Sequence, residues 1–163
     1  MLSEARAACL LAAVLAGAAC APAAETVVQP SDAEFNRPPA NAFEEAFSKE
    51  DGVQRIRWGG WMKTLVPGTG AAPGVDDRVT VNYRGTLTDG TEFDSSYKRG
   101  RPATFPLSGV IPCWTNGVMM MKAGGKAKFV CPAATAYGDR GSPPAVPGGA
   151  TLVFEIELLG VAR

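Results

Sequence analysis

The stretch VTVNYRGTLTDGTEFDSS, residues 79–96, brings two rings and a carboxylate toward one another. Its first half alternates apolar and polar residues, which predicts a half-buried strand that carries Tyr83. An Asp-Gly pair then signals a hairpin turn, and the returning strand carries Phe93 and Asp94. Core packing explains the rings, but a carboxylate is costly to bury unless it is hydrogen-bonded. Asp94 either belongs to a functional site or caps a surface loop.

The composition excludes several kinds of chemistry. The 163 residues include no histidine, so serine–histidine–aspartate and cysteine–histidine catalysis are excluded, as are histidine-ligated metal sites. The formal net charge is zero, which gives no basic patch to suggest nucleic-acid binding. We therefore expect no metal, no cofactor and no nucleic-acid partner.

The first 24 residues have the pattern of a signal peptide. A weakly charged start precedes an apolar run, residues 7–19, that is too short to span a bilayer. Residues 21–23 read Ala-Pro-Ala, a small-residue cleavage site, whereas Cys20 after small residues suggests a lipoprotein site, although Gly17 stands where leucine is favoured. We expect a periplasmic or secreted protein, released or else attached to a membrane through a lipidated Cys20.

Export changes the interpretation of the two cysteines that follow the leader, Cys113 and Cys131. In an oxidising compartment, an even pair separated by a modest loop is a disulfide candidate. Two buried free thiols are the alternative, because cysteine packs like a small apolar residue. Without histidine or further thiols the pair cannot fill a zinc site.

Residues 25–52 read as a linker with one short helix. The polar, proline-rich segment 25–40 is followed by Asn41, a good helix cap, with Phe43 and Phe47 four residues apart on one face. This helix either docks on the following domain or lies ahead of it.

From about Val53 the chain predicts strands around one short helix. The sequence has 19 glycines and 13 prolines, which indicates many turns. Strands are predicted in WMKTLV, RVTVNYRGTL, TEFDSSY, GKAKFVC and ATLVFEIELLGV, the last with glutamates on its solvated side. Trp114, Val118 and Met121 have helical spacing after Pro112, and the triple methionine there predicts core packing. The proline-rich loop PAATAYGDRGSPPAVPGG is long enough to suggest a function.

Four segments together resemble the FKBP-type peptidyl-prolyl cis-trans isomerases. They are VTVNYRGTLTDGTEFDSS, FPLSGVIPCWTNGVMMMKAGGKAKF, AYGDRG and GGATLVFEIELLGV, in the family's order and spacing over residues 53–163. The resemblance implies an α+β fold, an antiparallel β half-barrel wrapped around one short α-helix. The expected organisation is a signal peptide (1–24), a linker (25–52) and an isomerase domain (53–163).

The same resemblance implies a ligand pocket with Trp114 as its floor. Its implied walls are Tyr83, Phe93, Asp94, Val110, Ile111, Tyr137 and Phe154, with Phe105 at its edge. The Tyr137 hydroxyl is expected to donate a hydrogen bond to a ligand carbonyl, and Ile111 is a second candidate donor through its backbone N–H. Asp94 is expected to hydrogen-bond to the ligand or to polarise the environment of the rotating carbonyl.

Some positions depart from the commonest family pattern. Cys113 stands where many members have glycine, and Cys131 lies on a strand expected to pass the helix start, which favours a disulfide that pins the pocket floor. Ala103 replaces a residue that is aromatic in some members, so we expect a more open rim. Ala145 and Val146 replace bulkier aliphatic residues, which puts tight binding of macrolide inhibitors in doubt.

The resemblance predicts a monomeric peptidyl-prolyl cis-trans isomerase that acts on unfolded or proline-containing polypeptides outside the cytoplasm. The alternative is a binding or chaperone module with the same pocket and little turnover. A thiol oxidoreductase that uses Cys113 and Cys131 is a weaker hypothesis. The usual redox motif has two cysteines separated by two residues, and the spacing here is far longer.

Overall fold

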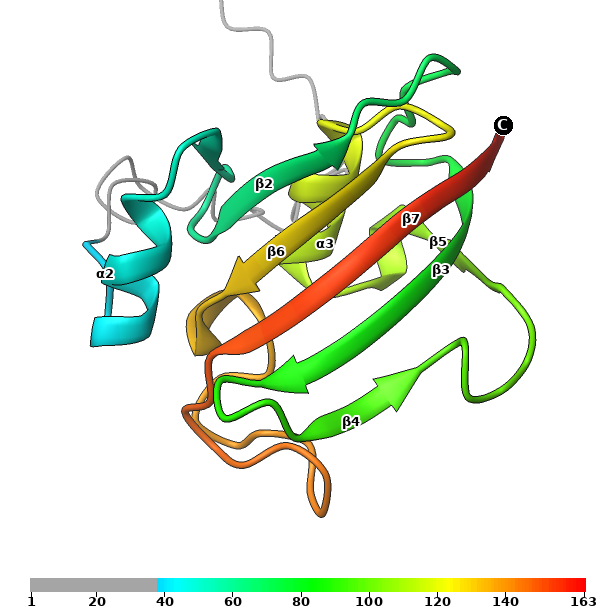
Figure 1. Cartoon of the computed structure of the whole chain (residues 1–163). Coiled ribbons are helices and arrows are strands. Elements are labelled where there is room, and N and C mark those ends of the chain that lie inside the picture. Colours follow the sequence, from blue (N-terminus) through cyan, green and yellow to red (C-terminus); the bar gives the residue numbers. More distant parts are fainter. Residues whose placement is uncertain (1–37) are drawn as a thin grey trace, which may run out of the picture.

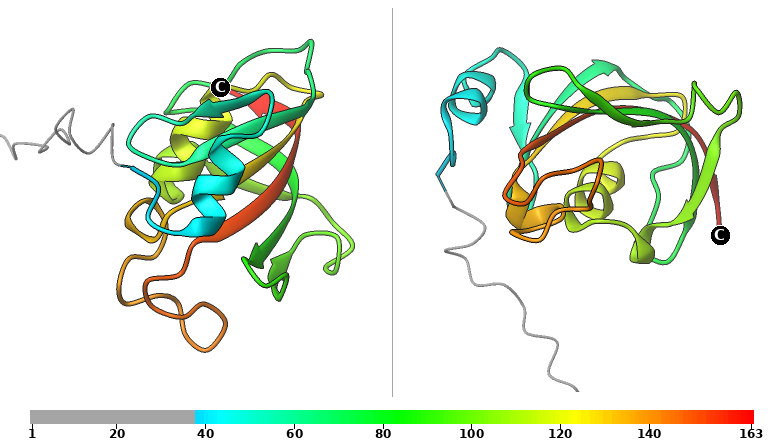
Figure 2. Two further views of the ribbon diagram at one scale, coloured as in Figure 1. Left: turned by 60° about the vertical axis from the view of Figure 1, so that its left-hand side comes forward. Right: turned by 90° about the horizontal axis from the view of Figure 1, so that it is seen from below.

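The computed structural model describes residues 38–163, in which one antiparallel sheet curls around a short helix (Figures 1 and 2). The sheet has seven strands in the order β1-β2-β6-β7-β3-β4, and β5 also pairs with β3. The strands are β1 (Val53–Arg55), β2 (Trp61–Val66), β3 (Arg78–Leu87), β4 (Glu92–Ser95), β5 (Ala103–Pro106), β6 (Lys126–Cys131) and β7 (Leu152–Ala162). This arrangement confirms the predicted half-barrel.

The concave face of the sheet holds α3 (Pro112–Met119) and the main core. Alternation along the strands decides which side chains enter that core: Phe154, Ile156 and Leu158 are at most 3% exposed, and the glutamates between them are not buried. Gly117 lets α3 lie close to the sheet, because a Cβ there would come within 2.7 Å of the Phe129 ring.

The helix prediction holds in outline and fails at its end. Pro112 is the first residue of α3, as predicted, and Trp114 and Val118 are buried. The triple methionine does not pack as a unit: Met121 is buried, but Met120 is 43% exposed. The reason is that the helix stops at Met119, so the next residues no longer follow its inward face.

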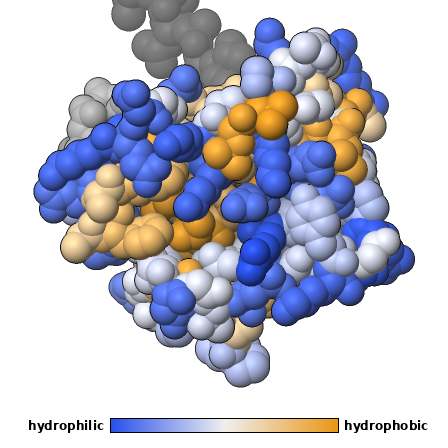
Figure 3. Space-filling model, in the orientation of Figure 1, coloured by the Kyte–Doolittle hydropathy of each residue, from blue (hydrophilic) through white to orange (hydrophobic). Residues whose placement is uncertain are grey.

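The short helix α2 (Ala42–Ser48) docks on the outer face of the sheet. Asn41 caps it as predicted, since its side chain accepts a hydrogen bond from the backbone N–H of Glu44. Figure 3 shows that hydrophilic side chains cover most of this outer face. Phe47 covers an apolar exception, a cluster with Trp61, Val130 and Val153.

A buried glutamate locks α2 to the domain. Glu44 is fully buried and accepts hydrogen bonds from the Thr151 hydroxyl at 2.6 Å and from the backbone N–H of Ala40 at 2.7 Å. Asn41 also donates to the Thr151 hydroxyl at 2.8 Å. The sequence left open whether this helix docks on the following domain or lies ahead of it, and the structure shows that it docks. No helix in residues 38–163 is long and apolar enough to cross a membrane.

Candidate functional site

Trp114 forms the floor of a cavity on the concave side of the sheet. Its indole makes edge-to-face contacts with Tyr83, Phe154 and Phe105, at centroid separations of 5.1, 5.2 and 6.0 Å. Phe93 adds a further edge-to-face contact to Phe154 at 5.6 Å. Rings that meet edge to face hold one another in fixed orientations, so the walls of this cavity are preorganised.

The cavity has a volume of about 300 Å³ and brings together the predicted pocket residues from six separate segments. Its lining consists of Tyr83, Phe93, Asp94, Phe105, Gly109, Val110, Ile111, Trp114, Tyr137 and Phe154. Gly109 is the one lining residue that the sequence did not indicate, because a glycine beside a 3₁₀ turn carries no chemical signal. The segment η1 (Leu107–Gly109) precedes α3 and supplies this part of the wall.

Two short segments position the floor. The backbone N–H of Trp114 donates to the carbonyl of Ile111 at 2.9 Å, which starts the first turn of α3. The Thr115 hydroxyl donates to the carbonyl of Leu107 at 2.7 Å and so ties that turn to η1. Gly85, on β3, leaves room for the rings above: a Cβ there would lie 2.7 Å from Phe93 and 2.9 Å from Phe154.

The predicted disulfide between Cys113 and Cys131 is present. Both residues are fully buried, and the bridge joins the second residue of α3 to the last residue of β6. It therefore fixes the start of the helix that carries Trp114 to the sheet. Gly60 passes so close that a Cβ there would be 3.3 Å from the Cys113 sulfur.

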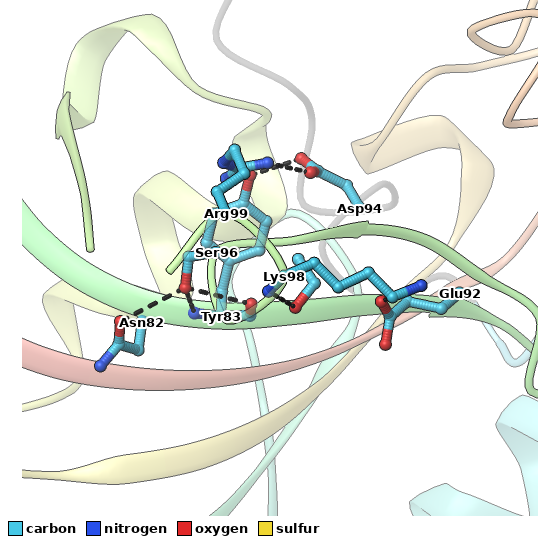
Figure 4. A network of polar contacts seen from close by, with 8 residues as sticks. Asn82, Tyr83, Glu92, Asp94, Ser96, Lys98 and Arg99 are labelled. Atoms are coloured by element: carbon cyan, nitrogen blue, oxygen red, sulfur yellow. Dashed lines mark hydrogen bonds and ion pairs between the residues drawn. The ribbon is translucent and has the colours of Figure 1, made fainter. Parts of the chain in front are cut away.

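At the rim, Tyr83, Asp94 and Arg99 form one hydrogen-bonded group (Figure 4). The Tyr83 hydroxyl donates to Oδ2 of Asp94, and Arg99 donates from one nitrogen to Oδ1 of Asp94. The other terminal nitrogen of Arg99 donates to the Tyr83 hydroxyl at 2.7 Å. The guanidinium carbon also lies 5.3 Å from the centroid of the Tyr83 ring, a cation–π contact.

Of the two alternatives for Asp94, a functional site and a surface loop, the structure shows a residue of β4 that lines the cavity. Its side chain is 41% exposed, because β4 runs along the edge of the sheet and presents Asp94 at the mouth of the cavity. Arg99, five residues after Asp94, was not among the predicted site residues, although a cation that close to a carboxylate in the sequence could have indicated it. The ion pair places a compact charged group beside the apolar walls.

The protonation states of this group follow from its contacts. Burial and the hydrogen bond to Asp94 raise the pKa of Tyr83 to about 12. Burial alone would raise the pKa of Asp94, but the Tyr83 hydrogen bond and the Arg99 guanidinium outweigh it and lower that pKa below its ordinary value. At neutral pH the tyrosine is therefore protonated and the aspartate ionised.

Ser96 fixes the backbone from which Tyr83 projects. The buried Ser96 hydroxyl accepts a hydrogen bond from the backbone N–H of Tyr83 at 2.9 Å and donates to Asn82 at 3.3 Å. The backbone N–H of Ser96 donates back to the carbonyl of Tyr83 at 2.9 Å. The predicted hairpin is thus secured at the point where its two strands carry Tyr83 and Asp94 (Figure 4).

Several hydrogen-bond donors at the cavity are not used within the described part of the chain, among them the buried indole N–H of Trp114. No residue in 38–163 accepts a hydrogen bond from the Tyr137 hydroxyl or from the backbone N–H of Ile111. Tyr137 is 40% exposed, and burial together with the negative charge of Asp94 raises its pKa. Its hydroxyl therefore keeps its proton at neutral pH and can donate to a ligand.

Comparison with known proteins agrees with this geometry. Residues 70–159 match the sequence profile of a family described as FKBP-type peptidyl-prolyl cis-trans isomerase. The chain is 48% identical over 130 residues to the FKBP-type peptidyl-prolyl cis-trans isomerase FkpA of Escherichia coli, a match that covers 80% of this chain and 48% of FkpA. It is 43% identical over 131 residues to the outer membrane protein MIP of Legionella longbeachae, covering 80% of this chain and 56% of MIP.

Solved structures show the same likeness. The crystal structure of Escherichia coli FkpA superposes with a TM-score of 0.71 at 49% identity, over 74% of this chain and 56% of that one. The crystal structure of a peptidyl-prolyl cis-trans isomerase from Pseudomonas syringae superposes with a TM-score of 0.70 at 38% identity, over 74% of this chain and 89% of that one. The chain spans about half the length of FkpA. On the matched profile, the level of identity and the shared fold, this chain belongs to the family of FKBP-type peptidyl-prolyl cis-trans isomerases.

Proposed function

We propose that this protein accelerates cis-trans isomerisation of X-Pro peptide bonds in polypeptide clients by holding the prolyl ring in the cavity above Trp114. Membership of the family supports the activity. The observation that carries the proposal is the closed set of rings around Trp114, which offers an apolar slot with an ion pair only at its rim.

The energetics of the reaction suit such a site. Rotation about an X-Pro bond crosses a barrier of about 18–20 kcal/mol because amide resonance must be lost. Lowering the half-time from tens of seconds to milliseconds requires about 5–6 kcal/mol of transition-state stabilisation. No covalent bond breaks, so the walls need only favour the twisted amide over the planar one and exclude water.

Each wall has a separate role in this proposal. Trp114 supports the face of the prolyl ring, and Phe154, Tyr83, Val110 and Ile111 surround it. Phe93 and Phe105 extend the apolar wall toward the residues that flank the proline. Since the aromatic rings already hold one another in place, little side-chain entropy is lost when the substrate binds.

Two of the unused donors orient the peptide. The Tyr137 hydroxyl donates to a substrate carbonyl, and the backbone N–H of Ile111 donates to a second one. These hydrogen bonds hold the chain on both sides of the rotating bond while the prolyl ring stays fixed. Tyr137→Phe therefore weakens catalysis while leaving the cavity walls in place.

Asp94 acts through its charge in this proposal. Both of its oxygens already accept hydrogen bonds, from Tyr83 and Arg99, so it holds the Tyr83 ring and forms with Arg99 a fixed ion pair at the mouth of the cavity. A rotating amide changes its dipole, and a fixed charge beside it stabilises one orientation over another. Asp94→Ala removes this field and also leaves the Tyr83 hydroxyl without its acceptor.

An isomerisation assay on a proline tetrapeptide tests the function, with the wild type compared with Tyr137→Phe, Asp94→Ala and Phe154→Ala. We expect acceleration by the wild type and at least tenfold lower kcat/KM for Phe154→Ala, which opens the wall beside Trp114. Absence of acceleration by a folded wild type that still binds the peptide would establish the alternative, a binding or chaperone module.

The proposed clients are exported proteins. The apolar leader with its cleavage site lies in residues 1–24, outside the described residues, as does the proposed lipid attachment at Cys20. The buried disulfide and the name of the relative called outer membrane protein MIP support a site of action outside the cytoplasm. Mass spectrometry of the mature N-terminus distinguishes cleavage after Ala23 from a lipidated Cys20.

A further inference from the structure

A second cleft adjoins the cavity above Trp114. It has a volume of about 460 Å³ and is lined by Tyr83, Arg99, Arg101, Pro102, Ala103, Thr104 and Phe105. Tyr83 and Phe105 also line the first cavity, and their ring centroids lie 6.1 Å apart. The two spaces are therefore separated only by a wall of two rings.

The path of the chain along the edge of β3 creates this cleft. β4 pairs with the second half of β3 and β5 with the first half, and residues 96–102 leave the sheet between them (Figure 1). The chain re-enters the sheet at Ala103, whose methyl group fills little of the space beside Tyr83. The more open rim expected from Ala103 corresponds to this cleft.

The charged side chains that line the cleft are both arginines, and they differ in their partners. Arg99 is committed to Asp94 and the Tyr83 hydroxyl. Arg101 is exposed and makes no hydrogen bond or ion pair with any residue in 38–163. One guanidinium thus faces the cleft with its charge uncompensated.

The surrounding segment carries an excess of positive charge. Residues 96–102 contain Lys98, Arg99 and Arg101 and no carboxylate. Lys98 and Arg99 pair with Glu92 and Asp94 of β4, and the nearby Glu157 of β7 accepts a hydrogen bond from Tyr97. Arg101 is the cation of this loop that has no carboxylate partner within residues 38–163. Such an excess attracts anionic groups on the substrate.

A peptide bound above Trp114 has residues close enough to enter this cleft, because Tyr83 and Phe105 line both spaces. Neighbouring Cα atoms are about 3.8 Å apart, so a residue within two positions of a proline seated on Trp114 can extend its side chain past Tyr83 and Phe105. Building on the proposed isomerase function, we infer that the cleft is a subsite for an acidic side chain next to the substrate proline. Arg101 is its specificity-determining residue.

A peptide series tests this inference. The peptides share one proline and carry Glu, Gln or Lys at each of the two positions before it and the two after it. For each peptide, kcat/KM comes from NMR exchange spectroscopy and Kd from chemical-shift titration. At low salt we expect kcat/KM for the Glu peptide to exceed that for the Lys peptide by about 1.5- to fivefold at one or two of the positions, the range of exposed ion pairs. In about 0.5 M salt this ratio approaches one.

Variants identify the residue. Arg101→Gln is expected to bring the Glu/Lys ratio close to one, and Arg101→Glu to invert it. Arg57→Gln removes an equal charge from a side chain that packs on Trp58 and does not line the cleft, so the wild-type ratio is expected to remain. Arg101 lies in an exposed loop, and thermal melts verify that each variant is folded.

The outcomes separate this inference from the function on which it rests. Acceleration of every Gln peptide with no Glu/Lys preference at any position overturns the acidic subsite and leaves the isomerase function intact. If no peptide is accelerated, the isomerase function fails, and the Kd ratio alone then decides on the subsite. A preference that survives Arg101→Gln contradicts the role of Arg101.

Discussion

The hydroxyl of Tyr83 donates a hydrogen bond to the carboxylate of Asp94 across the β3–β4 hairpin, and Arg99 donates to both groups. The tyrosine ring simultaneously packs edge to face on Trp114. A polar group at the rim therefore positions an aromatic wall of the cavity. This relationship explains why a carboxylate follows an aromatic residue in the returning strand of the hairpin.

Replacing Tyr83 with phenylalanine tests that relationship. Tyr83→Phe keeps the ring but removes the donor that helps to lower the pKa of Asp94, so we expect this pKa to rise and kcat/KM to fall about two- to tenfold, the value of a typical hydrogen bond. Carboxyl NMR titration and kinetics measure the two effects. Tyr97→Phe, whose hydroxyl contacts Glu157, is the control. An unshifted Asp94 would show that the hydrogen bond has no influence on its ionisation.

The pH dependence of kcat/KM is expected to be flat from about pH 5 to 9. Asp94 has a lowered pKa, so the folded state gains stability from it above the ordinary carboxyl pKa and loses that stability as the pH falls through the lowered value. Tyr83 has a raised pKa, so its contribution is complete below pH 10 and is lost as the pH rises through about 12. A kinetic pKa between 6 and 8 would require a titrating group that the site does not contain.

Gly85 is expected to control the shape of the cavity. A methyl group in Gly85→Ala would meet both Phe93 and Phe154, which must then move, at a cost of about 1–3 kcal/mol in the free energy of unfolding. The affinity of the Gly85→Ala variant for a proline peptide is also expected to be lower than that of the wild type. Gly160→Ala places the same methyl group on β7 with no atom within 4 Å. Equal stability of the two variants in urea denaturation would refute this packing argument.

The disulfide is expected to stabilise the fold by about 3 kcal/mol, the loop-closure value for cysteines 18 residues apart. Dithiothreitol should therefore lower the urea midpoint of the wild type. The double variant Cys113→Ser, Cys131→Ser should have a lower urea midpoint than the oxidised wild type, and dithiothreitol should not change it. Full reduction of the wild type is checked by thiol titration. A fully reduced wild type with an unchanged urea midpoint would contradict this prediction.

The sequence indicated the parts of the fold that depend on local patterns. Alternation predicted β3 and β7, and helical spacing after Pro112 predicted α3, because the buried residues repeat with the period of each element. β1 and β5 were not predicted, since both are short and neither has a continuous apolar run. Their pairing depends on the strands beside them.

Contacts between distant residues were beyond such patterns. No local pattern marks Glu44 as buried, because its burial depends on Thr151, 107 positions away. The pocket residues were identified by their resemblance to a family, and their convergence on Trp114 comes from the register of β3, β4 and β7. Arg101 was not predicted because a loop cation gives no periodic signal, and Arg99 was marked only by its closeness to Asp94 in the sequence.

The most direct test of the central proposal is the rate of cis-trans exchange of a proline tetrapeptide, measured by NMR exchange spectroscopy with catalytic amounts of protein. We expect exchange to accelerate in proportion to protein concentration, from tens of seconds toward milliseconds at the active site, with a strong loss in Phe154→Ala. The contradicting result is a peptide that binds without being isomerised faster. Its resonances would shift on addition of the protein, but its cis-trans exchange rate would equal that of the free peptide.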